Sequence, residues 1–544
     1  MKVESWNWTK NQPLAETYIH QFHQVQSLYE YDHRNDSSWV ERAEWLDRTR
    51  GSRADRNRLA DALRQYNLSI GASPAALANV EKLRDERALV VVGGQQSGLF
   101  TGPALAVWKA ITIVQTAARA AERLGRPVLP VFWIAGEDHD WEEVNHFHYL
   151  AGDLSVRKYR LPDVPLAGRA PVSRVELTEE AWRSALDALS AAMADTEHKP
   201  GLLEQLRRLT HSSRTLSEQF ARIFAWLFAD SGLVLADAAD PALRRLEGPM
   251  FRRIIEERRP LGAAIVAGRD DVGAMGFVPQ ADASEEQLHL FVLERGQRLP
   301  LIERDGAIAD RKTGRRWTER ELADIAEREP ERLSNDALTR PIMQDYVLPV
   351  LATVLGPAEI AYWGLLRRAF AQFGMKMPIL LPRQEYTLID PASAKAMQRL
   401  GLTFAEVANG LAARREQLLA GMERHPLSDR FDDVRRRILE AYEPLAAAVA
   451  EQQPELANIA ETNVRKLQEQ IDYLRRRAED AYFKRQESPL RQLDTVAAKL
   501  LPMGKPQERV YSVFGYLNQH GFAWFVELVR KPPEDAAMHQ LIYL

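Results

Sequence analysis

Two short apolar segments, joined by a helical one, constrain the fold of this chain more than any other feature. Residues 88–92 and 127–134 are continuous apolar runs, with the length and composition of strands buried in a parallel sheet. Residues 103–123 between them are rich in alanine and begin with Pro103, a residue that favours the first turn of a helix. Strand, helix and strand in this order predict an α/β fold with a parallel sheet.

The predicted core continues beyond residue 150 but is interrupted. Further strands are expected at 232–237 and 377–382, and helices near 341–354 and 357–373. We therefore divide the chain into N-terminal helices and the first half of the core (1–150), a first connecting insertion (151–230), core (231–259), a second connecting insertion (260–335), core (336–390), a helical coiled coil (391–500) and a C-terminal segment that packs back on the core (501–544).

Heptad spacing predicts the coiled coil. Apolar residues recur in alternating steps of three and four between Phe431 and Ala448, and again between Ala460 and Ala481. Pro454 lies between the two runs and would break a continuous helix. An antiparallel helical hairpin follows, and we expect it to pair two subunits into a homodimer.

Composition excludes several classes of function. The 544 residues carry 72 basic and 76 acidic side chains, a net charge of −4, so a basic face for nucleic acid is not expected. The absence of cysteine excludes a thiolate metal site and a thiol nucleophile. No stretch approaches the ~20 apolar residues of a membrane span, and the N-terminal residues lack signal-peptide character. We expect a cytoplasmic protein without nucleic-acid or membrane partners.

Four glycines separate the first strand from its helix. They flank polar residues that include Ser97 and Thr101, and Lys109 lies about two turns into the helix. Glycines allow close backbone approach to a ligand, and a helix N-terminus attracts anions. The spacing matches neither dinucleotide-binding nor P-loop motifs. A tight turn without a ligand therefore stays an equal alternative.

An acidic segment, Glu137-Asp138-His139-Asp140, directly follows the second strand. Ligands of open α/β sheets bind at this carboxyl end, and carboxylates beside an imidazole can orient it or raise its pKa. A metal bound by Asp138, His139, His146 and His148 is a weaker alternative, because the segment contains no H-E-x-x-H motif. A solvated acidic loop is the alternative without function.

Two further segments carry candidate binding residues. Arg340 lies at a predicted helix start and offers a planar, charged fork for carboxylate or phosphate. A capped helix with Arg340 paired to a nearby acid explains the same residues. A turn with Lys505, followed by Arg509, would suit a nucleotide phosphate, but these residues alone favour a plain surface turn.

Together these motifs resemble the bacillithiol-biosynthesis cysteine ligase family, BshC. The resemblance rests on segments in family order over most of the chain: 94–103 (GQQSGLFTGP), 132–140 (FWIAGEDHD), 338–346 (LTRPIMQDY), 356–363 (GPAEIAYW) and 507–509 (QER). It implies an α/β fold with a Rossmann-like parallel-sheet core, two connecting insertions and a C-terminal antiparallel coiled coil that dimerises. It also implies the last step of bacillithiol synthesis, which joins cysteine to the amino group of glucosaminyl malate.

The resemblance does not settle the catalytic residues, so we assign the site residues as a hypothesis. His139 would be the general base, held by Asp138 or Asp140 and accompanied by Glu137. Substrate would bind at Gly94, Gln95, Gln96, Ser97, Gly98, Thr101, Gly102, Asn335, Thr339, Arg340, Gln344, Asp345, Glu359 and Tyr362. Lys505, Gln507 and Arg509 would bind a nucleotide.

Carboxyl activation implies a phosphate or adenylate leaving group, so we expect ATP (or ADP) to bind. We assign no metal ligands and leave a metal requirement open. Because the chain has no cysteine, any cysteine in the site is the substrate. Two alternatives remain: another nucleotide-using transferase on the same core, and a non-catalytic coiled-coil scaffold.

Overall fold

The computed structural model describes residues 2–165, 168–304, 306–420, 427–532 and 537–544. The chain forms two compact units. Unit 1 comprises Met1–Ala151, Val156–Leu388 and Gln507–Leu544, and unit 2 comprises Gly152–Ser155 and Ile389–Pro506. The finer division into seven segments stays a prediction.

A five-stranded parallel sheet forms the centre of unit 1, which confirms the predicted α/β class. Its strand order is β13-β12-β2-β3-β6, and every neighbouring pair is parallel. The strands span β2 Leu89–Gln95, β3 Val128–Ile134, β6 Val234–Asp237, β12 Val350–Leu355 and β13 Ile379–Pro382. The chain moves to one side after β2 and to the other after β12, so the topological switch point lies between these two strands.

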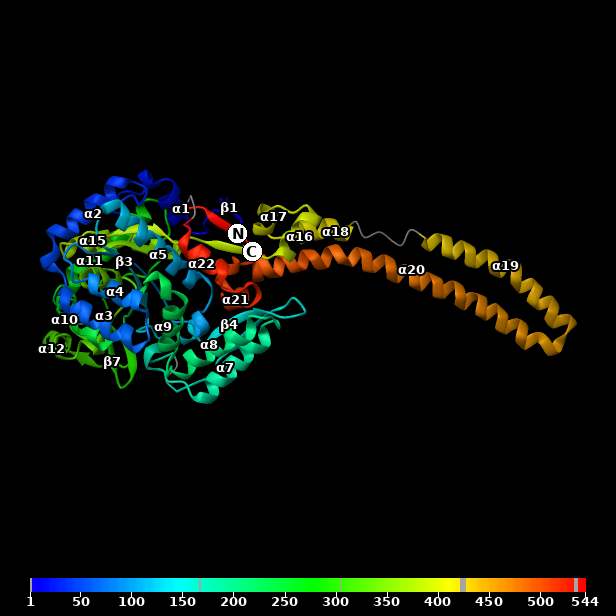
Figure 1. The fold of residues 1–544 in the computed structure, drawn as a ribbon, viewed down its shortest axis with the longest axis horizontal. Coiled ribbons are helices and arrows are strands. Elements are labelled where there is room, and N and C mark those ends of the chain that lie inside the picture. Colours follow the sequence, from blue (N-terminus) through cyan, green and yellow to red (C-terminus); the bar gives the residue numbers. More distant parts are fainter. Residues whose placement is uncertain (1, 166–167, 305, 421–426, 533–536) are drawn as a thin grey trace. The chain divides into compact units, whose positions relative to one another are not determined.

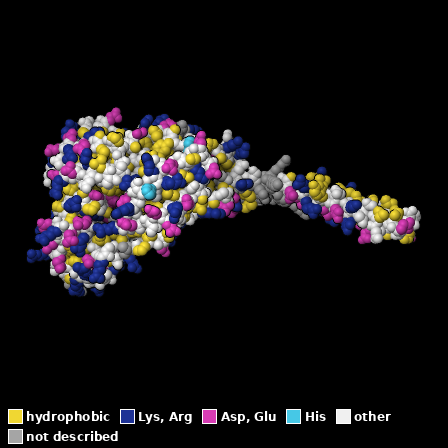
Figure 2. Space-filling view, turned by 60° about the horizontal axis from the view of Figure 1, so that its bottom comes forward, with side chains coloured by type: hydrophobic (Ala, Val, Ile, Leu, Met, Phe, Trp, Pro, Cys, Tyr) yellow, Lys and Arg dark blue, Asp and Glu magenta, His cyan; other side chains and the backbone are white. Residues whose placement is uncertain are grey.

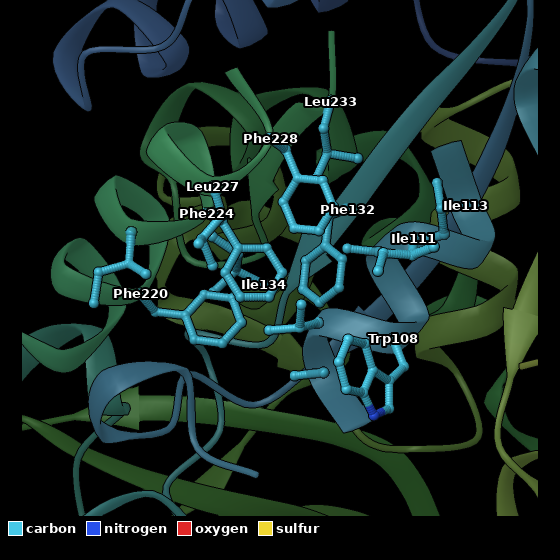
Figure 3. Packing of buried hydrophobic residues seen from close by; sticks show 14 of the residues in the cluster. Trp108, Ile111, Ile113, Phe132, Ile134, Phe220, Phe224, Leu227, Phe228 and Leu233 are labelled. Atoms are coloured by element: carbon cyan, nitrogen blue, oxygen red, sulfur yellow. The ribbon is translucent and has the colours of Figure 1, made fainter. Parts of the chain in front are cut away.

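Alternation along β2 divides the core into two clusters. Leu89 and Val91 belong to one cluster with α5 (Leu105–Leu124) and α9 (Leu216–Leu227). Figure 3 shows Phe132 and Ile134 of β3 packed between aromatic residues of α9 and side chains of α5. The opposite cluster contains Val90 and Val92 with residues of α1 (Pro13–His20), α3 (Arg56–Ser69), α4 (Pro74–Lys82), α10 (Pro241–Glu256), α11 (Arg258–Ala274) and α13 (Arg340–Val347).

The first insertion is mainly helical. A two-stranded hairpin pairs β4 (His146–Leu150) with β5 (Val156–Arg160). Helices α7 (Glu179–Ala192), α8 (Lys199–His211) and α9 follow it.

The second insertion is mainly an antiparallel sheet of order β10-β9-β8-β7-β11. Its elements are β7 Gln287–Glu294, β8 Gln297–Arg304, β9 Ala307–Asp310, β10 Arg316–Trp317, α12 Glu319–Arg328 and β11 Leu333–Asn335.

A small sheet joins the two ends of unit 1. β15 (His539–Tyr543) pairs antiparallel with β1 (Lys2–Trp6) and lies between β1 and β14 (Tyr386–Ile389). The remaining helices of this unit are α2 Asp36–Arg48, α6 Trp141–Val144, α14 Pro357–Trp363, α15 Arg367–Gln372, α21 Phe514–His520 and α22 Ala523–Arg530.

Unit 2 contains the predicted helical hairpin. Helix α19 (Ser428–Gln452) runs beside α20 (Ala457–Leu500) (Figure 1), and Arg475 of α20 pairs with Asp432 of α19 at 2.8 Å. A 3-10 turn at Pro454–Leu456 reverses the chain, as the proline predicts. Shorter helices precede the hairpin at α16 Pro391–Leu400, α17 Phe404–Ala408 and α18 Ala412–Ala420.

Two sequence predictions were wrong. The helix expected at 341–354 ends at Val347, and residues 350–355 form β12 in the middle of the sheet. A continuous apolar run of that length fits a buried strand as well as a buried helix, so periodicity cannot distinguish the two. The N-terminal region, expected to be wholly helical, begins with β1. No helix among the described residues is long and apolar enough to cross a membrane.

Candidate active site

A cavity of about 870 Å³ lies at the carboxyl ends of the central strands. Its walls come from the loop after β2, the loop after β3, the second insertion and the start of α14. This is the place where the switch point of an open α/β sheet binds ligands, and the volume suits a small-molecule site.

Steric constraints explain the glycines at the end of β2 and in the loop that follows it. A Cβ on Gly94 would lie 2.7 Å from the carbonyl oxygen of Trp133, and one on Gly98 would lie 2.8 Å from the Cα of Gly102. Phe100, Thr101 and Gly102 all have positive φ, a conformation that is strained for the first two. The Oγ1 of Thr101 is buried without a hydrogen-bond partner. Gly94, Gln95, Gln96, Gly98, Thr101 and Gly102 line the cavity.

Lys109 is buried beneath this loop, with only 1% of its side chain exposed. Its Nζ donates to the carbonyl oxygen of Gly94 at 2.7 Å, to Oε1 of Gln95 at 3.3 Å and to Oε2 of Glu359 at 2.6 Å. All three donors of the ammonium are therefore used. Burial lowers the pKa of Lys109, and the Glu359 carboxylate opposes that shift. Lys109 thus fixes α5 to the end of β2 and to α14.

The acidic loop after β3 contributes three of its four predicted residues to the cavity. Glu137 is buried and forms an ion pair with Arg244 of α10. The carboxylate of Asp138 accepts hydrogen bonds from the backbone N–H of His139 at 2.7 Å and from Gln96 at 3.1 Å. Although burial opposes its ionisation, the His139 side chain, the Arg298 charge and these two bonds hold the pKa of Asp138 well below its usual range.

Asp140 lies outside the cavity, in an adjoining hollow of about 580 Å³ that Asp138 and His139 also line. Glu143 borders both spaces. Burial, together with the charges of Asp140 and Asp138, raises the pKa of Glu143. Three side chains therefore border both spaces: the Asp138 carboxylate, the His139 imidazole and the Glu143 carboxyl group, whose pKa is raised.

His139 contacts a residue that we did not predict. Its Nδ1 lies 3.0 Å from Nη1 of Arg298, which belongs to β8. Phe291 of β7 lies beneath the Arg298 guanidinium, 3.7 Å from ring centroid to Cζ. Nothing in the sequence near 298 marks an inward-facing arginine, because alternation along a strand assigns a charged residue to the solvent face.

The described residues contain no group of three or more His, Asp or Glu side chains arranged to hold a metal ion. Of the histidines considered for that role, His146 pairs with Arg160 across the β4–β5 hairpin. Burial, with lesser contributions from Lys158 and His148, lowers the pKa of His146 to about 4.

Arg340 stands at the start of α13 and points its guanidinium at the Tyr362 hydroxyl, 2.6 Å away. Both residues line the cavity, as do Glu359 and Asn335. Within the described parts of the chain, no carboxylate lies within ion-pair distance of Arg340. The Oδ1 of Asn335 and the Nε1 of Trp133, also on the cavity wall, are buried and unpartnered.

Four predicted substrate-binding residues lie away from the cavity wall. Ser97 bonds Ser217 of α9, 2.9 Å between hydroxyl oxygens, and the Thr339 hydroxyl donates to the His289 carbonyl oxygen at 2.6 Å. Asp345 is fully buried between Arg42 and Arg53. Gln344 is also buried and does not line the cavity. These contacts join elements of the core, so a binding role for the four residues stays a prediction.

The three predicted nucleotide-binding residues are divided between the units. Lys505 belongs to unit 2, and Gln507 and Arg509 belong to unit 1. The Gln507 amide accepts from Leu388 N at 2.9 Å and donates to Leu388 O at 2.9 Å. Arg509 is exposed and lines the cavity. A nucleotide site formed by these three residues stays a prediction.

Fold and site together define a Rossmann-like α/β protein with a coiled-coil hairpin and a ligand cavity lined by both basic and acidic side chains. Residues 1–384 match the model of the bacillithiol biosynthesis BshC N-terminal Rossmann-like domain, and residues 386–544 match that of the BshC C-terminal coiled-coil domain. The chain therefore belongs to the BshC family of bacillithiol biosynthesis.

Curated relatives match over nearly the full length. A protein of Symbiobacterium thermophilum is 36% identical over 97% of both chains, and one of Geobacillus sp. is 34% identical over the whole of both. One of Bacillus licheniformis is 30% identical, again over the whole of both chains. Each is named "Putative cysteine ligase BshC".

Proposed function

We propose that this protein is a cysteine ligase that forms an amide between cysteine and the amino group of glucosaminyl malate, the last step of bacillithiol synthesis, in the cytoplasm. Family membership and the names of the relatives support this function. The structural observation that carries it is the Arg340 guanidinium on the cavity wall, which no described carboxylate contacts within ion-pair distance.

Among the described residues, the half-buried Arg340 guanidinium bonds directly only to the Tyr362 hydroxyl. Glu359 and Glu137 attract its charge without an ion-pair contact, so its other N–H groups are available for a substrate carboxylate. The two-pronged N–H geometry of arginine matches a carboxylate oxygen pair. Both proposed substrates carry carboxylates. Arg340 would hold one of them, with Asn335 and Tyr362 beside it on the same wall.

The cavity also fits a phosphate-bearing co-substrate. Arg509 lines it without a carboxylate partner among the described residues, and the loop after β2 brings backbone close to the space. ATP, when bound, would supply the phosphate or adenylate leaving group that the cysteine carboxyl needs. The chain's own residues would hold the anionic groups (Arg340 and Arg509) and keep the loop in place (Lys109).

We further propose that the hairpin of unit 2 forms a homodimer. Several of its apolar side chains are exposed, and Figure 2 shows hydrophobic side chains on its surface among charged ones. The exposed residues include Val434, Leu445, Ile459, Tyr473 and Leu474. Light scattering during gel filtration measures the mass; a concentration-independent monomer would reject the dimer.

The test of the ligase is a reaction of purified protein with cysteine, glucosaminyl malate and ATP, followed by mass spectrometry of the thiol product. Arg340→Gln is expected to lower kcat/KM about 100-fold or more, because it removes a charged partner of a carboxylate. Arg340→Lys should recover part of the loss. Arg252→Gln, which alters an exposed arginine of α10, is the matched control.

The nucleotide product separates the alternatives. A ligase consumes ATP only when cysteine is present, whereas another nucleotide-using transferase would consume it without cysteine. A scaffold would form no product and show no ligand-dependent rise in melting temperature. Either result would overturn the proposed function.

A further inference from the structure

Arg298 is held on three sides in the cavity wall. Only 6% of its side chain is exposed. Its Nε donates to the Ser334 hydroxyl at 3.0 Å, and its Nη2 donates to the Asn335 carbonyl oxygen at 2.5 Å. The Phe291 ring supports the plane of the guanidinium. The remaining nitrogen, Nη1, points at Nδ1 of His139 at 3.0 Å and lies 3.6 Å from Oδ1 of Asp138.

This contact determines which nitrogen of His139 carries the proton. A guanidinium is always protonated and only donates, so the Nδ1 of His139 must accept. A neutral imidazole has one N–H, which then resides on Nε2. The alternatives are unfavourable. A proton on Nδ1 would place two N–H donors, one from His139 and one from Arg298, face to face. An imidazolium would place two cations in contact.

Asp138 does not reverse this assignment. Its Oδ1 accepts from the backbone N–H of His139 at 2.7 Å, whereas the ring Nδ1 lies 3.6 Å away. The carboxylate therefore neutralises part of the Arg298 charge and leaves the ring nitrogen to Arg298. No other described residue forms a hydrogen bond with Nε2 of His139, and His139 lines the cavity.

We propose that Arg298 is a positioning residue that fixes the Nε2–H form of His139, so that His139 donates a hydrogen bond to an anionic oxygen in the cavity and does not accept the proton of the amine. This reverses the general-base role expected from the sequence, because the nitrogen left free toward the cavity carries a hydrogen. The tautomer follows from the structure alone, whereas the hydrogen bond to substrate rests on the proposed function.

The first test needs no activity. The full-length protein is labelled with ¹⁵N-histidine, and the His139 signals, among those of 12 histidines, are identified by their loss in His139→Gln. Long-range ¹H–¹⁵N spectra at neutral pH distinguish a protonated Nε2 from a protonated Nδ1. We expect Nε2–H in the unaltered protein and a mixture of forms in Arg298→Gln. Arg316→Gln, an exposed arginine of the same sheet, should leave the tautomer unchanged.

The second test compares two replacements of His139 in the ligase reaction. The amide nitrogen of glutamine can occupy the place of Nε2 and donate, but it cannot accept a proton at neutral pH. If His139 is a donor, His139→Gln should keep at least about tenfold more activity than His139→Ala. This difference is smaller than the loss of about 100-fold or more that follows removal of an oxyanion-hole donor. Equal activities of the two variants would overturn the donor role.

A protonated Nδ1 in the unaltered protein, or a tautomer insensitive to Arg298→Gln in a variant that circular dichroism shows to be folded, would overturn the positioning role. Should the protein lack ligase activity altogether, the proposed function would fail while the tautomer result would still stand. Arg298→Lys offers a further check, since it keeps the charge and loses the fork and should restore the Nε2–H form only in part.

Discussion

The two insertions into the parallel core differ in what they give to the site. The second insertion supplies Phe291, Arg298 and Asn335 to the cavity, whereas no residue between 151 and 230 lines it. The first insertion instead contributes Phe220 and Phe224 to the core beside β3. Both insertions therefore contribute buried side chains to the core, and the second also lines the cavity.

The largest expected effect is on stability, at the first insertion. Phe220→Ala removes a buried ring that stacks on Phe224 with centroids 4.1 Å apart. We expect a loss of about 3–5 kcal/mol in the free energy of unfolding, with unchanged kcat for the molecules that remain folded. Urea denaturation measures the loss, and the half-buried Trp226→Ala of the same helix should cost less.

A smaller effect, on activity, is expected at the second insertion. Phe291→Leu keeps an apolar side chain but removes the ring face beneath Arg298. A cation–π contact worth about 1–2 kcal/mol corresponds to a loss of roughly 5–30-fold in kcat/KM. Phe277→Leu, elsewhere in the same insertion, is the control. If Phe291→Leu strongly lowered the free energy of unfolding but left kcat/KM unchanged, the two insertions would not differ in their effect on activity.

The next prediction concerns α10, which packs against α12 of the second insertion. The two helices are close, because a Cβ on Gly248 of α10 would lie 2.5 Å from the carbonyl oxygen of Ala326 in α12. Burial raises the pKa of Glu247 from 4.5 to about 8, although Arg244 opposes the shift. The folded state thus retains a proton that the unfolded state releases, so this contribution to stability is complete below about pH 4.5 and is lost as pH rises toward 8.

Glu247→Gln has no proton to lose. The melting temperature of the variant, relative to the unaltered protein, should rise by roughly 1–4 °C between pH 5 and pH 8. Differential scanning calorimetry at three pH values measures this change. A relative melting temperature that does not rise between pH 5 and pH 8 would show that Glu247 is ionised in the folded protein.

The smallest effect is expected at Asp163, which lines the hollow that contains Asp140. Asp163 is 93% exposed and pairs with Arg160 at 3.5 Å. Because exposed ion pairs contribute little, Asp163→Asn should change stability by less than about 1 kcal/mol and leave kcat/KM within about twofold. A tenfold loss of activity would place the first insertion in the site after all.

Sequence reasoning succeeded where the signal was local. Apolar runs located β2, β3, β6 and β13, and the rule that ligands bind at strand carboxyl ends directed attention to the loops that now line the cavity.

It failed where a contact joins distant residues. Arg298 and His139 are 159 positions apart, and Asp345 meets Arg42 across 303 positions. Neither partner choice follows from local spacing. The sequence placed Lys109 after the glycine loop, but its acceptor Glu359 becomes evident only once α14 is placed beside it.

The small sheet β1-β15-β14 has a consequence for biosynthesis. β15 pairs with β1, and every other strand and helix lies between them in the chain. β1 is synthesised long before β15, so its edge stays unpaired until β15 has been made. The helical hairpin forms through local contacts and can be complete by then. Closure of this sheet therefore comes late in the folding of unit 1, and the β1 edge can pair with other chains in the meantime.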